Sequence, residues 1–246
     1  MDRMLYVAMS GAKETMLAQA VNSHNLANIS TTGFRKDLES FAALHVRGPV
    51  HESRTYTIDQ GKGVDFSQGP MVQTGRDLDI AIQGEGWIAV QAPDGGEAYT
   101  RAGDLRINSA GILSNGAGFP VLGEGGPIAI PEFETLSIGA DGTITVRALG
   151  QPTNALTVVD RIKLVNPPQE DLEKGADGLI RTRTGDPLAP DADVEIISGA
   201  IEGSNVNGVD AMVNMIQLSR QYELQVKMMK VAEETDQAAA QLIRFG

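Results

Sequence analysis

Proline is absent from both ends of this 246-residue chain, and that absence constrains its fold more than any other feature. All 11 prolines lie between Pro49 and Pro190, and only five of the 28 glycines fall within residues 1–35 and 203–246. Proline lacks a backbone donor and glycine costs backbone entropy, so both are disfavoured inside helices. The two ends are therefore compatible with long helices, whereas the centre is not.

Residues 1–35 predict a helix that runs to about Asn28. Leu5, Met9 and Met16 recur with alanines at spacings of three and four residues, which places them on one helix face. The following segment, NISTTGF, is rich in short polar side chains that compete for backbone hydrogen bonds. Gly33 can take a left-handed conformation there, so we expect a turn after the helix.

A second helix is predicted within residues 201–246. It begins at Asn207, whose side chain can accept a hydrogen bond from the backbone N–H near Asp210. Its apolar residues form two adjacent seams, one with Met212, Met215, Tyr222, Val226 and Met229 and the other with Val213, Ile216, Leu224, Met228 and Val231. A helix with two apolar seams needs more than one neighbour.

The centre predicts short strands joined by tight turns, which gives an α+β chain that is mainly β. Leu78 to Gln83 alternates apolar and polar residues before a Gly-Glu-Gly turn, and Trp87 to Gln91 is the predicted partner strand. Residues 155–165 form the longest strand candidate. We therefore predict four segments: a helix in 1–35, an extended linker or small β region in 36–75, a β-domain in 76–200, and a helix in 201–246 that pairs with the first in a coiled-coil-like layer.

Charge is concentrated in the centre. Residues 1–35 hold three basic and two acidic side chains, and residues 203–246 hold four and five, so the net charge of −12 belongs entirely to residues 36–202. Such a chain repels the phosphate backbone of nucleic acids, and we exclude nucleic acid as a partner. With no cysteine, the chain has no disulfide and no thiolate metal site.

Residues that could carry catalysis are sparse. The sequence HESRT at residues 51–55 lacks the second histidine of a zinc-binding helix, and His24 and His45 supply no obvious cluster. Asp77 and Asp79 lie two residues apart on a predicted strand, where both should face solvent instead of flanking a sugar in a cleft. We predict no catalytic residue, no cofactor and no metal.

Segments at both ends resemble the signatures of flagellar rod and hook proteins. NLANISTTGFRK, residues 25–36, is similar to their N-terminal signature, and SNVNGVDAMVNMIQLSRQYE, residues 204–223, to the one that opens their last helix. QGPMVQTGRDLDIAIQGEGWIAV and YTRAGDL, residues 68–90 and 99–105, are similar to their central β-domain. The start MDRMLYVAMSGA, the sequence GPIAIP and the chain length most resemble the proximal-rod members, with the distal-rod members as the alternative.

The resemblance implies a structural subunit of the drive shaft that transmits torque from rotor to hook. Its terminal helices would form an inner tube with copies of itself and other rod proteins, without a small-molecule substrate or membrane insertion. It implies a place in the periplasmic rod of the basal body, reached through the flagellar type III export apparatus without a cleaved signal peptide. The N-terminus indeed lacks the apolar run of a secretory signal.

The predicted assembly residues are packing and turn residues: Leu5, Met9, Met16, Asn25, Asn28, Gly33, Ser204, Asn205, Met212, Met215, Tyr222, Val226 and Met229. Asn25 and Asn28 could equally be plain turn formers. Two alternatives from other classes stay open at this point. One is an acidic β-domain that binds a soluble partner and dimerises through its helices, and the other is a hydrolase acting on the cell wall.

Overall fold

The computed structural model describes residues 2–46, 54–152 and 155–244 and divides into two compact units. The first contains residues 1–28, 36–65 and 206–246, and the second contains residues 29–35 and 66–205. Long helices occur at the two ends and short strands in the centre, which confirms the predicted α+β class.

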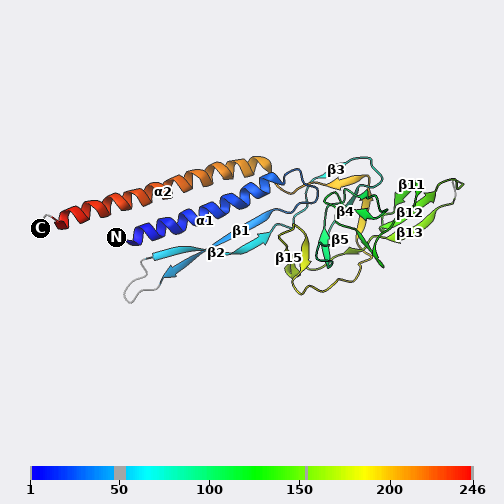
Figure 1. Ribbon diagram of the computed structural model, residues 1–246, viewed down its shortest axis with the longest axis horizontal. Coiled ribbons are helices and arrows are strands. Elements are labelled where there is room, and N and C mark those ends of the chain that lie inside the picture. Colours follow the sequence, from blue (N-terminus) through cyan, green and yellow to red (C-terminus); the bar gives the residue numbers. More distant parts are fainter. Residues whose placement is uncertain (1, 47–53, 153–154, 245–246) are drawn as a thin grey trace. The chain divides into compact units, whose positions relative to one another are not determined.

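The first unit is built on two helices and a β-hairpin (Figure 1). α1 spans Asp2–Ala27 and α2 spans Gly208–Arg244, and they lie side by side. The hairpin consists of β1 (Asp37–Val46) and β2 (Arg54–Val64), which pair antiparallel from Asp37 opposite Val64 to Val46 opposite Arg54. α2 begins as predicted, because the Asn207 side-chain oxygen accepts from the backbone N–H of Val209 over 3.0 Å.

Two larger sheets organise the second unit. A five-stranded antiparallel sheet has the order β14 (Leu164–Val165), β5 (Trp87–Gln91), β6 (Glu97–Thr100), β16 (Ile180–Thr182) and β15 (Leu172–Lys174). A three-stranded sheet has the order β11 (Phe133–Ile138), β12 (Thr143–Ala148) and β13 (Thr157–Arg161). A short 3-10 helix, Gln169–Asp171, precedes β15.

Four two-stranded pairs complete this unit within the described residues. They are β4 (Ile80–Gln83) with β17 (Glu195–Ser198), β3 (Met71–Gln73) with β18 (Ala200–Glu202), β7 (Arg106–Ile107) with β8 (Leu113–Ser114), and β9 (Leu122–Gly123) with β10 (Gly126–Pro127). The two strands after residue 194 thus pair with strands in residues 71–83.

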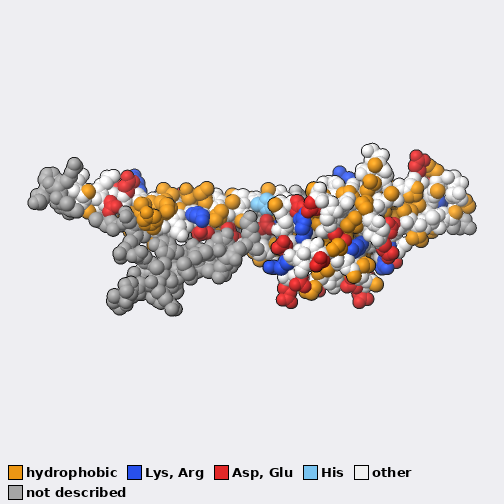
Figure 2. All heavy atoms as spheres, turned by 60° about the horizontal axis from the view of Figure 1, so that its bottom comes forward, with side chains coloured by type: hydrophobic (Ala, Val, Ile, Leu, Met, Phe, Trp, Pro, Cys, Tyr) orange, Lys and Arg blue, Asp and Glu red, His pale blue; other side chains and the backbone are white. Residues whose placement is uncertain are grey.

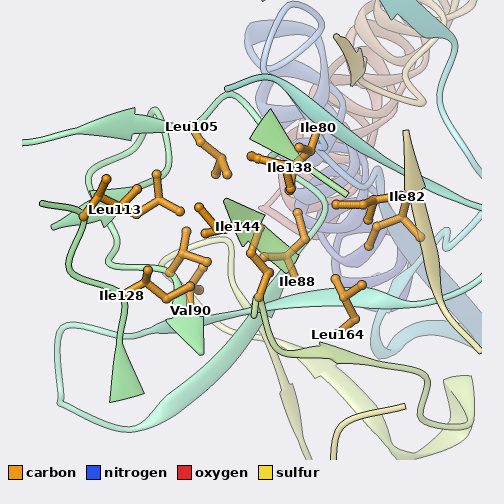
Figure 3. Close-up of a cluster of buried hydrophobic side chains, with 14 of the residues drawn as sticks. Ile80, Ile82, Ile88, Val90, Leu105, Leu113, Ile128, Ile138, Ile144 and Leu164 are labelled. Atoms are coloured by element: carbon orange, nitrogen blue, oxygen red, sulfur yellow. The ribbon is translucent and has the colours of Figure 1, made fainter. Parts of the chain in front are cut away.

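A large apolar core brings strands of several of these sheets together (Figure 3). Ile82 of β4, Ile88 of β5, Ile144 of β12 and Leu164 of β14 are buried in the same cluster. A second, smaller cluster is formed by residues of the five-stranded sheet: Trp87, Ala89, Tyr99, Val165, Leu172 and Ile180. Each sheet is too small to bury an apolar face alone, so packing into shared cores is what stabilises them.

Two strand predictions are wrong. The strand over residues 80–83 pairs with β17 and not with β5, which instead lies between β14 and β6. The single long strand predicted over residues 155–165 is two strands, β13 and β14, which belong to different sheets. Both errors arise because a strand's apolar pattern is satisfied by any apolar partner, including one more than 100 residues away.

Candidate assembly interface

The contact between α1 and α2 uses small residues on α1. Ala8 and Ala12 are buried, and Gly11 between them lies against the Gln225 side chain of α2. Farther along, the Asn22 side-chain amide donates to the Ala211 carbonyl over 2.7 Å. These two contacts fix the helices as antiparallel neighbours, because residue numbers rise along α1 while they fall along α2.

On α2, buried and half-buried residues recur at alternating spacings of four and three. The residues are Ala211, Met215, Leu218, Tyr222, Gln225, Met229 and Ala232. This spacing keeps one side of a helix facing one neighbour over many turns. It marks the side of α2 that faces α1.

Many large apolar side chains of both helices are exposed. On α1 they are Met4, Leu5, Tyr6, Val7, Met9, Met16 and Leu17, and on α2 they are Val209, Met212, Val213, Ile216, Leu224, Val226, Met228 and Val231. Figure 2 shows hydrophobic side chains at the surface along the helices. Contiguous exposed apolar surface of this kind is unusual on a monomer and marks sites of interaction. We call these residues the apolar helix surface.

The eight packing residues among the predicted assembly residues divide between the two sides. Met215, Tyr222 and Met229 are half-buried on the α1-facing side. The other five packing residues belong to the apolar helix surface, with Met16 61% and Met212 57% exposed. The structure therefore separates a side of α2 that α1 covers from residues that stay exposed in the described part of the chain.

A groove of about 520 Å³ lies at the far end of the helix pair. Its lining residues are Leu5, Ala232, Glu233, Asp236, Gln237, Ala239 and Ala240. Ala232 belongs to the α1-facing side of α2, and Ala239 continues its spacing toward the C-terminus. The groove is thus lined by α2 together with Leu5 of α1, at the end of the helix contact.

The predicted turn residues make specific backbone contacts. Asn25 is buried, and its side chain both donates to the Asp37 carbonyl over 2.8 Å and accepts from the Asp37 N–H over 2.9 Å. Asn28 donates from its side chain to the His24 carbonyl at the end of α1. The His24 ring nitrogen Nδ1 lies 3.0 Å from an Asp37 carboxylate oxygen, so the start of β1 is held to the end of α1.

The other three turn residues belong to the second unit. Gly33 has φ +65° and donates its N–H to the Glu202 carbonyl over 2.8 Å. Asn205 donates to the Ser67 carbonyl over 3.0 Å, and Ser204 is buried.

Four residues that sequence reasoning did not single out form a buried cluster, which we call the clasp: Arg35, Trp87, Arg101 and Glu202. Glu202 is 1% exposed, and its carboxylate accepts from Arg35 over 2.8 Å and from Arg101 over 2.9 Å. Both guanidinium groups lie over the Trp87 ring, 5.6 and 5.4 Å from its centre. Each clasp residue lies in or next to a recognised motif, but no spacing rule connects them.

The clasp is closed by further bonds. The Gly69 N–H donates to the Glu202 carboxylate over 2.9 Å, and Arg35 also donates to the Ser67 carbonyl. Arg101 donates to the Gly84 carbonyl over 2.8 Å. Burial lowers the pKa of Arg101, and the opposing charge of Glu202 acts in the other direction. A buried charge is tolerated only when it is paired in this way.

The described residues contain no group of three or more metal-ligating side chains, and the side chains of His45 and His51 lie outside them. Asp79 is buried beside Arg76, whereas Asp77 is exposed, so the prediction that both face solvent is wrong for Asp79. None of the helices in this part of the chain has the length and apolarity needed to cross a membrane.

Three family models match the chain. Residues 5–35 match "Flagella basal body rod protein", residues 81–146 match "Flagellar hook protein FlgE/F/G D1 domain", and residues 197–242 match "Flagellar basal body rod FlgEFG protein C-terminal".

Curated relatives match along the full length. The flagellar basal-body rod protein FlgF of Salmonella typhimurium is 41% identical over 249 residues, covering 99% of each chain. FlgF of Caulobacter vibrioides is 36% identical over 98% of each chain. The rod protein FlgG of Buchnera aphidicola from Schizaphis graminum is 30% identical, over 97% of this chain and 98% of its own.

Proposed function

The chain belongs to the family of flagellar basal-body rod proteins, and from this membership we propose that it is a structural subunit of the proximal rod. FlgF proteins reach 41% and 36% identity, whereas FlgF and FlgG of the Buchnera from Schizaphis graminum are both 30% identical, and the two higher values favour the proximal over the distal rod. Members of this family are structural proteins and not enzymes. The subunit would transmit torque from rotor to hook without performing chemistry.

The apolar helix surface is the observation that carries this proposal. Exposing so many large apolar side chains to water is unfavourable by roughly 25 cal/mol per Å² of apolar surface. Copies of this chain and other rod proteins would cover that surface, with the terminal helices in a coiled-coil-like layer. Leu5, Met9, Met16, Met212 and Val226 would then contact neighbouring subunits, while Met215, Tyr222 and Met229 hold α2 to α1.

Charge separation agrees with this arrangement. Residues 1–35 and 203–246 sum to zero charge, and the whole −12 lies in residues 36–202. Neutral helices can be brought together without the repulsion that a large net charge would cause.

We propose that export follows the flagellar type III route and that the subunit resides in the periplasmic part of the rod.

Electron microscopy of basal bodies from a strain lacking this chain tests the proposal, with mass spectrometry of the rod proteins that remain. We expect the rod to be missing beyond the point where this subunit is added. A Met212→Asp variant should fail to restore motility, because its charge would be buried between subunits. Gln217→Asp, which adds the same charge at another exposed position of α2, should restore it. An intact rod and hook without this chain would refute the proposal and favour an acidic domain that binds a soluble partner.

A further inference from the structure

The second unit also exposes large apolar side chains, and they gather in two places. Except for Ile29, every such side chain in the described part of this unit belongs to one of two groups. We call them the edge patch, which is Met71, Val72 and Ile197, and the tip patch, which is Leu149, Leu156 and Val158. Their exposed fractions lie between 41% and 63%.

The edge patch lies around β3. Within the described residues this strand pairs only with β18, so it is the edge of a two-stranded sheet. Met71 and Val72 point to opposite faces of β3, and both are about half exposed. The Thr74 N–H donates to the Gly199 carbonyl over 2.8 Å, which brings the end of β17, with Ile197, next to β3. An edge strand that is open on both faces favours contact with another chain.

The tip patch lies at one end of the three-stranded sheet. Leu149 directly follows β12 and Leu156 directly precedes β13, so the two leucines flank the connection between these strands. Val158 pairs with Thr145, on the face of the sheet opposite the buried Val146. Figure 1 shows β3 and the three-stranded sheet at separate places in this unit.

Both patches lie in uncharged stretches of an acidic region. No charged residue occurs within residues 66–75, 148–159 or 196–201, although residues 36–202 carry the whole net charge of −12. Acidic copies of this unit repel each other, so they can approach closely only where like charges do not meet. A basic partner would instead be attracted to the acidic surface around the patches. The occupant that the two patches fit is therefore another copy of this chain.

We propose that the tip patch of one copy packs against the edge patch of the next copy. A contact between two different surfaces can repeat from copy to copy without closing, as an open filament requires. Three large side chains on each side cannot supply the roughly 800 Å² per partner that a stable complex buries. The contact would therefore form only where helix contacts already hold neighbouring copies together, and in this sense it rests on the proposed function.

Cross-linking in assembled rods tests this contact, and the absence of cysteine suits the chain to it. Val72→Cys and Met71→Cys are each combined with Val158→Cys in the full chain, which is expressed in a strain that lacks the native one. Purified basal bodies are then treated with a short bis-maleimide, which reacts with thiolates. The control combines Val158→Cys with Thr184→Cys, which is exposed outside both patches.

We expect one of the two test pairs to give covalent dimers and longer multimers of this chain. The yield should exceed that of the control pair at least tenfold, and the single variants should give no multimer. One pair is expected to dominate because Met71 and Val72 lie on opposite faces of β3.

Four results would overturn the inference. They are no multimer from either pair in strains that swim, an equal yield from the control pair, linkage by Val158→Cys alone, and linkage only to a different rod protein. If chains with Val158→Cys do not restore swimming, Leu156→Cys of the same tip patch replaces it under the same criteria. A rod that is lost without this chain but gives no cross-link would remove only this contact and leave the proposed function standing.

Discussion

The side chain of Gln225 occupies the space that a Cβ atom on Gly11 would need, with its Nε2 atom 2.8 Å from the ideal Cβ position. Gly11 lies within α1 and Gln225 on the α1-facing side of α2. A glycine inside a helix costs about 1 kcal/mol relative to alanine, so this one is explained by the room it leaves for its neighbour.

Gly11→Leu should therefore destabilise the helix pair by about 1–3 kcal/mol, because the contact would be overpacked. Adding Gln225→Ala should recover much of that loss by emptying the space. Ala20→Leu, at an exposed position of the same helix, is the control and should have little effect. Urea unfolding followed by circular dichroism measures all three, and equal losses for Gly11→Leu with and without the second change would contradict the contact.

Gly33→Ala should destabilise the protein more than Gly11→Leu does. Its Cβ would lie 2.3 Å from backbone atoms of Arg101 and Ala102, which cannot rotate away, and φ is +65°. We expect a loss of at least about 3 kcal/mol from clash and backbone strain together. Gly75→Ala is the matched control, because its φ is +73° but nothing lies within 4 Å of its Cβ position. A similar loss for both variants in thermal unfolding would show that backbone strain alone decides the effect.

Glu202→Gln should destabilise the second unit more than Arg35→Met does. Removing the carboxylate charge leaves two buried guanidinium groups without a counter-charge, and breaking a buried pair costs about 3–5 kcal/mol. Arg35→Met removes one guanidinium group and leaves Arg101 and Glu202 as a pair of opposite charges. Chemical denaturation of both variants gives the comparison, and the reverse order of stabilities would contradict the assigned charges.

Asp177 should contribute a small acid-sensitive part of stability. Its hydrogen bonds from Arg181, at 2.8 and 2.6 Å, lower the pKa of the carboxyl group. A lowered pKa in the folded state means that the stabilisation is complete above the unfolded pKa of about 4 and is lost as the pH falls through the folded value. Asp177→Asn should flatten the decline of unfolding free energy between about pH 5 and pH 3, by less than about 1 kcal/mol because the pair is partly exposed. If the slope of unfolding free energy against pH is unchanged in Asp177→Asn, the ion pair between Asp177 and Arg181 does not contribute to acid sensitivity.

Local signals were sufficient for the helices and for several strand positions. The helix cap at Asn207 can be predicted from residues 207–210 alone, and the alternating residues from Ile80 to Gln83 do form a strand. Strand partners were not predictable in the same way, because β4 pairs with a strand more than 100 residues later. Sequence periodicity identifies an apolar face but not the surface that covers it.

The clasp was missed for a related reason. Arg101 and Glu202 are 101 residues apart in sequence, and an isolated arginine or glutamate is ordinarily a solvated surface residue. Among the seam residues, periodicity placed Met212 and Met215 together, whereas the structure exposes the first and half-buries the second. The sequence of one chain does not show whether an apolar helix residue packs against the other helix of the same chain or against a neighbouring copy.

Trp87 is the only tryptophan of the chain, and both guanidinium groups of the clasp lie over its ring. Its emission therefore reports on a single location, where segments from both ends of the chain meet. In an assembled filament every copy would carry the same unlabelled fluorophore at the same place. The opening of this junction under mechanical load or during disassembly can thus be followed optically in the native protein.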